Sequence, residues 1–131
     1  MPVLTFDQLV PGREFGRQPF DCSAEVIERW RAIYPELPPP AGGRVPPGLA
    51  AVIAITAYGR LTSPRPDGNV HGSQRFRWRR LPRVGERLDT TVRLKSAELR
   101  QERRWVSIET LTSDAEGQPV LEGEMVILWA R

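Results

Sequence analysis

Residues 48–58 read GLAAVIAITAY, and this run decides the fold. Only Thr56 and Tyr58 carry polar side-chain atoms in it, so a helix built from it is apolar nearly all round. Such a helix has to be enclosed by the rest of the protein. A bilayer span needs roughly 20 apolar residues, about twice this length. We therefore expect a buried central helix and no membrane partner.

The segments before this run predict a loop, a helix and a strand. Residues 35–47 hold six prolines and two glycines, which excludes a helix or a strand ladder and predicts a loop. Ser23 is a suitable N-cap for a helix from about Ala24 to Tyr34. Residues 14–20 precede it and predict a short first strand.

After residue 69 the hydrophobic period changes to two, which is typical of strands. The alternation places one apolar-leaning set on one face (Val70, Gly72, Gln74, Phe76, Trp78) and one polar set on the other (His71, Ser73, Arg75, Arg77, Arg79). Further strands are expected near residues 88–94, 103–112 and 120–129, with a turn at 114–117. We predict an α+β protein in which an antiparallel sheet wraps around the central apolar helix, the architecture called the hot-dog fold.

Composition limits the chemistry. The 131 residues predict a single domain, and all but one of the 19 basic residues are arginine. One cysteine (Cys22) and one histidine (His71) cannot supply a structural zinc site or an iron–sulfur cluster, so we expect no metal and no cofactor. An unpaired cysteine, with no basic segment ahead of an apolar run at the N-terminus, predicts a cytoplasmic protein.

Several motifs carry a family resemblance. They are FDQLVPG at residues 6–12, VPPGL at 45–49, HGSQRF at 71–76, and the stretch RLP to VGERL at 80–88. Together with the turn at 114–117 and the final strand, these motifs resemble the MaoC-like hydratase and dehydratase family. The similarity is greatest to the dehydratase-like N-terminal or partner domains of that family.

The resemblance implies binding of an acyl thioester, on coenzyme A or an acyl carrier protein, at the interface of a homodimer or a heterodimer of hot-dog subunits. Backbone N–H groups at the start of the central helix, those of Gly48 and Leu49, would polarise the thioester carbonyl. Together with Pro47 these residues are the thioester-binding positions that the resemblance implies, and a plain helix start after proline is the alternative. Active members carry an Asp and a His five positions apart in the preceding loop. Residues 35–47 contain neither, and their only ionisable groups are Glu36 and Arg44.

Two residues are candidates for catalysis in place of that pair. Glu36 could act as a general base if burial raised its pKa, although a solvated carboxylate is the favoured alternative. His71 could donate a proton or contact the thioester, and its favoured alternative is a structural or exposed histidine. No carboxylate lies between residues 48 and 61, which argues against the chemistry of hot-dog thioesterases.

Residues 75–87 hold six arginines against one acidic residue, Glu86. A solvated or salt-bridged strand face is the first interpretation of this arginine strip. The second is contact with carrier phosphates by Arg44, Arg75 and Arg77, since arginine binds phosphate in a bidentate way. Nucleic-acid binding comes last and we expect none, because alternation separates the aromatic residues from the arginines.

Two hypotheses about function follow. The chain is a hydratase or dehydratase that acts on an acyl thioester with a rearranged set of residues, or it is a non-catalytic subunit whose homologous partner supplies the Asp and the His. The missing pair favours the second for the chain in isolation, and the sequence does not decide whether the chain is itself an enzyme.

Overall fold

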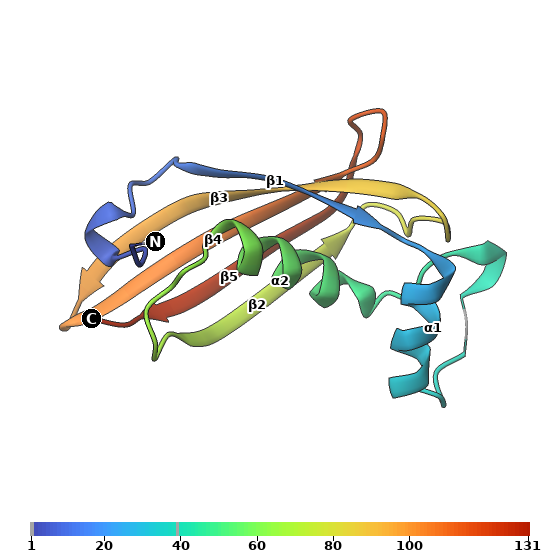
Figure 1. Ribbon diagram of the computed structural model, residues 1–131, viewed down its shortest axis with the longest axis horizontal. Coiled ribbons are helices and arrows are strands. Elements are labelled where there is room, and N and C mark those ends of the chain that lie inside the picture. The colour runs from blue at the N-terminus through green and yellow to red at the C-terminus, as the bar shows by residue number, and fades with distance from the viewer. Residues whose placement is uncertain (1, 39) are drawn as a thin grey trace.

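The computed structural model describes residues 2–38 and 40–131, so that Pro39 of the predicted loop lies outside the described residues. Five antiparallel strands form one sheet in the order β1-β3-β4-β5-β2 (Figure 1). Their bounds are Glu14–Asp21 for β1, Val70–Trp78 for β2, Arg87–Arg100 for β3, Arg103–Ser113 for β4 and Pro119–Trp129 for β5. The predicted strand order along the chain is confirmed.

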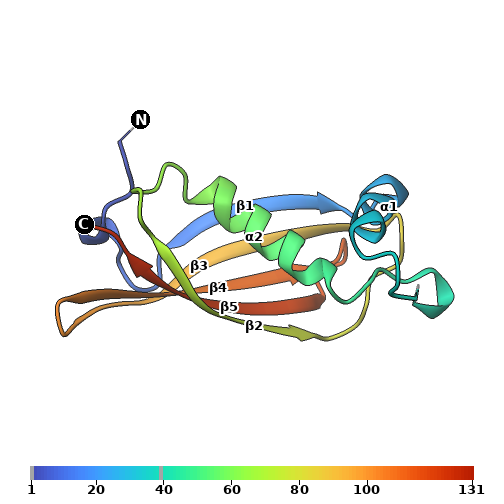
Figure 2. The ribbon, with the colours of Figure 1, turned by 90° about the horizontal axis from the view of Figure 1, so that it is seen from below.

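Two helices accompany the sheet. Helix α1 (Ala24–Ile33) begins after Ser23, whose hydroxyl accepts the Val26 N–H at 3.2 Å as an N-cap. Helix α2 (Leu49–Leu61) is the apolar run, and it lies across one face of the sheet (Figure 2). Helix α1 lies at the end of the molecule where α2 begins. Short 3-10 turns occur at Phe6–Gln8 and Ala41–Gly43. This arrangement confirms the hot-dog fold.

The sheet covers only one side of α2. The buried side chains are Leu49, Ala50, Ile53, Ala54, Ala57 and Tyr58. On the opposite side Val52 and Ile55 remain 37% and 38% exposed. The expectation that the chain encloses its own helix is therefore wrong, because the sheet packs against one helix face and no other segment among residues 2–38 and 40–131 buries the opposite face. We call the uncovered residues Ala51, Val52 and Ile55 the α2 stripe.

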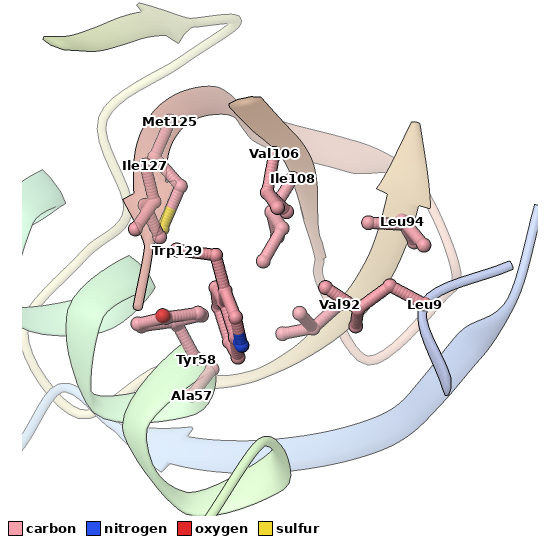
Figure 3. Close-up of a cluster of buried hydrophobic side chains, with 10 residues drawn as sticks. All are labelled: Leu9, Ala57, Tyr58, Val92, Leu94, Val106, Ile108, Met125, Ile127 and Trp129. Atoms are coloured by element: carbon pink, nitrogen blue, oxygen red, sulfur yellow. The ribbon is translucent and has the colours of Figure 1, made fainter. Parts of the chain in front are cut away.

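Two clusters of buried apolar side chains form the core. One surrounds Tyr58 and Trp129 near the end of α2, where helix and sheet side chains point toward one another (Figure 3). The other surrounds Leu49 and Ile53 near its start. Four buried threonines, Thr62, Thr90, Thr110 and Thr112, belong to neither cluster.

A β-bulge in β2 changes which side chains share a face. His71 pairs with Ile127, whereas Ser73 pairs with Val126, so Gly72 is an extra residue without a pairing partner. Opposed residues of an antiparallel pair point to one face, and the extra residue of a bulge reverses the alternation beyond it. His71 therefore shares the α2 face of the sheet with buried Ile127, while Val70 turns to the outer face with Leu128. The predicted faces of Val70 and His71 were wrong for this reason.

None of the helices in the described part of the chain is long and apolar enough to cross a membrane. Within residues 2–38 and 40–131, no group of three or more His, Cys, Asp or Glu side chains could hold a metal ion.

Candidate functional site

The loop that leads into α2 is fastened to the connection between β2 and β3. The backbone N–H of Val45 donates to the Pro82 carbonyl at 2.9 Å, and Val45 is fully buried. The Arg44 guanidinium donates to the Leu81 carbonyl at 3.0 Å, so this arginine is occupied in holding the loop. Two anchors on one short segment fix the position at which α2 begins.

Two tryptophans frame the start of α2. The Trp78 indole N–H at the end of β2 donates to the Pro47 carbonyl at 3.0 Å. The Trp30 ring of α1 lies against Gly48, where an added Cβ would sit 2.4 Å from Trp30 Cζ2. Gly48 is therefore required by close approach of an indole ring. Pro47 and Gly48 remain exposed, so the helix start is accessible between the two rings.

The backbone N–H groups at this helix start differ in availability. Leu49 donates to the Pro46 carbonyl at 3.0 Å, and Ala50 donates to the Pro47 carbonyl at 3.2 Å. The Gly48 N–H has no hydrogen-bond partner among residues 2–38 and 40–131. Of the N–H groups that the sequence assigned to thioester binding, Gly48 thus has a free donor, while that of Leu49 is used by the first helical turn.

Trp78 also determines where the Gly48 N–H points. The Pro47 carbonyl and the Gly48 N–H belong to one peptide unit, and in a trans peptide these groups point in opposite directions. Because two donors hold the carbonyl, the N–H is held on the other side of the same plane. A donor of fixed direction at the positive end of a helix can stabilise an oxygen that gains negative charge.

Glu36 and His71 are not brought together within the chain. Glu36 follows α1 in the loop that leads to α2, and its side chain is exposed. His71 is exposed at the beginning of β2, seven residues from Trp78, which corresponds to about 23 Å along a strand. The histidine and the start of α2 therefore lie at opposite ends of the β2 strand.

The arginines of β2 lie opposite carboxylates on the outer face of the sheet. Arg75 lies opposite Glu124 and Arg77 lies opposite Glu122. Arg79 forms an ion pair with Glu122 at 2.9 Å. An open groove of about 510 Å³ lies on this face. Its lining includes Arg75 and Arg77 together with Glu109, Glu122 and Glu124. This geometry agrees with a strand face on which arginines and glutamates are juxtaposed, with an ion pair at Arg79, and it places Arg75 and Arg77 away from α2.

Sequence reasoning missed an ionic cluster at the β2–β3 connection, which we call the Arg80 clamp (Arg80, Glu86 and Asp114). The guanidinium donates to both Glu86 oxygens, one of them at 3.0 Å, and to Asp114 Oδ2 at 3.0 Å. Arg80 lowers the pKa of Glu86, while the Gln118 N–H and then Arg80 lower the pKa of Asp114. No local sequence signal links residues that are 34 positions apart.

The threonines of the core differ in hydrogen bonding. Thr90 Oγ1 and Thr112 Oγ1 lie 2.7 Å apart and satisfy each other. Thr110 is 3% exposed, and its hydroxyl has no partner among the described residues. Its neighbour across the strands is Gly123, whose added Cβ would sit 2.4 Å from Thr110 Oγ1.

The cysteine is inert. Burial raises the pKa of the Cys22 thiol to about 12, so almost no thiolate forms near neutral pH.

Comparison with known proteins identifies the fold. No protein-family model and no curated protein matches the chain. A MaoC-like dehydratase from Rhodospirillum rubrum is similar, with a TM-score of 0.80 and 15% identity over 98% of each chain. The unliganded R-hydratase PhaJ1 from Pseudomonas aeruginosa has a TM-score of 0.78 and 14% identity, over 97% of this chain and 86% of that one.

A third similar structure is a complex of two kinds of subunit. The C-terminally truncated HadBC complex of Mycobacterium tuberculosis, a 3R-hydroxyacyl-ACP dehydratase, matches with a TM-score of 0.74 and 16% identity. The match covers 92% of this chain and 98% of that one. The chain thus has the hot-dog fold of MaoC-like dehydratases and R-hydratases, as its motifs implied.

Proposed function

We propose that this protein binds an acyl thioester, carried by coenzyme A or an acyl carrier protein, and belongs to the MaoC-like hydratases and dehydratases. The start of α2 carries this proposal. There an accessible Gly48 N–H of fixed direction lies between two indole rings. Addition of water across an enoyl thioester places negative charge on the thioester oxygen, and this donor would stabilise it.

The catalytic groups in this proposal are Glu36 and His71, because the loop before α2 has no Asp or His. Carrier phosphates would approach the same end of the molecule, where Arg44 lies beside the loop that it anchors. We assign Arg75 and Arg77 to the rim of a carrier-protein contact on the outer face, with their phosphate role limited by the glutamates opposite them.

The second candidate function is that of a non-catalytic subunit paired with a catalytic hot-dog homologue. The composition of residues 35–47 favours it, since both side chains of the usual pair are missing. The HadBC complex is a dehydratase built from two named components, which is the type of assembly this candidate requires.

Association with a second hot-dog subunit is part of both candidates. The α2 stripe leaves apolar side chains exposed, and β2 is an edge strand whose outer N–H and C=O groups have no strand partner within the described residues. Edge strands and apolar patches of this kind are usually covered by pairing. We place the protein in the cytoplasm, because thiols such as that of the unpaired Cys22 are kept reduced there.

The test is hydration of a short enoyl-CoA by the purified protein, alone and with the product of a neighbouring gene. Turnover by the purified protein alone supports the hypothesis that it is an enzyme. Turnover that appears only when the partner is added supports the hypothesis that it is a non-catalytic subunit. Binding is measured separately, as a rise in melting temperature with the acyl-CoA. If neither condition gives turnover and no thioester shifts the melting temperature, the proposal is wrong.

A further inference from the structure

The connection between β2 and β3, residues 79–86, lies at the end of the molecule where α2 begins (Figure 1). It holds the loop that leads into α2 through hydrogen bonds in both directions. The Val84 N–H donates to the Gly43 carbonyl at 2.8 Å. The Val45 N–H donates in return to the Pro82 carbonyl at 2.9 Å. The loop that delivers the free N–H at the start of α2 therefore depends on this connection for its position.

The same connection also holds the chain just before α1. The Cys22 N–H donates to the Glu86 carbonyl at 2.9 Å, and the Gly85 N–H donates to the Cys22 carbonyl at 2.7 Å. Cys22 is fully buried and comes shortly before the first residue of α1. Helix α1 carries Trp30, whose ring lies against Gly48. The aromatic ring and the backbone donor of the candidate site are thus anchored to one connection.

The connection has an irregular backbone, and the Arg80 clamp fixes it. The Arg80 guanidinium closes the connection by donating to both oxygens of Glu86 at its other end. The same Glu86 carboxylate accepts the Arg83 N–H at 2.9 Å. Arg80 also donates to Asp114, in the turn between β4 and β5, at 3.0 Å. One guanidinium therefore ties the connection to itself and to the sheet.

The bonds of the clamp are of a strong kind. Hydrogen bonds from a guanidinium to carboxylates are charge-assisted, and the arginine fork fixes their orientation. The side chains of Glu86 and Asp114 are only 22% and 12% exposed, so water and salt screen them less than surface pairs. Asp114 is itself fixed, because its Oδ1 accepts the Gln118 N–H at 2.9 Å. The position of the connection therefore depends on Arg80.

We propose that Arg80 is a positioning residue for thioester binding. This inference rests on the proposed function. Arg80 acts on the site only through the connection, which sets how the Trp30 ring lies relative to the Gly48 N–H. Binding groups have to be held within about 0.5 Å of their productive geometry, so a small shift of either group weakens binding. A clamp that only stabilised the fold would leave the affinity of the folded protein unchanged.

Amide hydrogen exchange tests the positioning without any thioester. In Arg80→Gln the Val45 and Gly85 amides should exchange about tenfold faster, because the connection that holds them opens more often. Amides in the middle of β4 should keep their rates. Arg79→Gln is the matched control, since Arg79 forms its ion pair with Glu122 at 2.9 Å, outside the clamp. Unchanged exchange in Arg80→Gln, or an equal acceleration in Arg79→Gln, would overturn the inference.

Titration calorimetry with an acyl-CoA tests the effect on binding, at a temperature at which urea unfolding shows each variant to be folded. Arg80→Gln should weaken binding about two- to tenfold, whereas Arg79→Gln should bind as the unmodified protein does. Arg80→Lys should recover part of the affinity, because an ammonium still pairs with the carboxylates but lacks the arginine fork. If Arg80→Gln unfolds more easily yet binds acyl-CoA normally, the clamp is only structural and the inference is wrong.

A second variant serves if Arg80→Gln does not fold. Asp114→Asn removes the charge at the β4–β5 turn and leaves Arg80 on Glu86, and its amide oxygen can still accept the Gln118 N–H. Its exchange and affinity should change in the same direction by a smaller factor, and no change in either would refute the role of the clamp. If the unmodified protein binds no acyl-CoA, the proposed function fails instead, and the exchange rates alone then decide whether Arg80 positions the loop.

Discussion

Substitution of Trp78 by phenylalanine tests whether the peptide between Pro47 and Gly48 is held for binding. The change keeps an aromatic ring and removes the indole N–H that donates to the Pro47 carbonyl at 3.0 Å. Such a bond contributes about 0.5–1.5 kcal/mol net. If the bond holds the Gly48 N–H in its binding direction, its loss should weaken acyl-CoA binding by a comparable amount, about two- to twelvefold.

Trp129 provides a matched control elsewhere in the sheet. Its indole N–H donates to the Leu4 carbonyl at 3.1 Å. Its ring packs with Ala57 and Tyr58, near the end of α2 and not its start (Figure 3). Trp129→Phe should lower the free energy of unfolding at least as much as Trp78→Phe, because Trp129 is only 4% exposed. It should leave the affinity for acyl-CoA unchanged.

The measurements are titration calorimetry with an acyl-CoA and urea unfolding, both at one protein concentration. Equal losses of affinity in the two variants would show that binding follows general stability. Unchanged affinity in Trp78→Phe would show that the orientation of this peptide plays no part in binding. Either result refutes the reasoning.

Two further predictions concern the core and the Arg80 clamp. Thr110→Val should raise the free energy of unfolding, because it removes a buried hydroxyl that has no partner among the described residues. Thr112→Val should lower it by about 1–3 kcal/mol, because it leaves the Thr90 hydroxyl unpaired. Both variants are measured by urea unfolding, and a change of the same sign in both would contradict the prediction. The clamp carboxylates have lowered pKa values, so their contribution is fully present above the unfolded pKa of about 4 and is lost as pH falls through the folded values. Acid unfolding followed by tryptophan fluorescence should therefore lose part of its pH dependence in Arg80→Gln, and an unchanged profile would count against the clamp.

The fold could be predicted because each helix and strand shows its own spacing of apolar residues within one continuous segment of the sequence. An apolar run at helical length and several alternating segments are local properties, and hot-dog topology is one of few ways to pack them. Even the helix N-cap at Ser23 was local enough to predict. What the pattern of α2 could not show is which of its apolar sides the chain leaves uncovered.

The prediction of the β2 faces failed at a single residue. Gly72 has no side chain to show on which face it lies, and its ideal Cβ would approach the Val126 carbonyl to 3.3 Å. Strict alternation assumes that every residue has a partner across the strand, and the bulge removes one. The bulge places His71 on the face of the sheet that α2 covers instead of on the arginine face.

The Arg80 clamp and the indole contacts of α2 were unpredictable for a different reason. Each joins segments far apart in sequence, such as Trp78 and Pro47, 31 positions apart, through one hydrogen bond. Pairwise contacts of this kind leave no period, and only the folded topology brings their members together. The same topology places Trp30 on Gly48, which explains a glycine that the sequence alone presents as a helix start after proline.

The candidate site at the start of α2 has the backbone donor that the proposed function needs, but it lacks the side chains of the usual catalytic pair. The start of α2 offers a fixed donor between two rings, but the only ionisable groups in the preceding loop are an exposed glutamate and an arginine that holds that loop. Within one chain the histidine lies a strand length away. One chain therefore does not bring a proton-transferring group to the start of α2, and this is why the proposed function includes association with a second subunit.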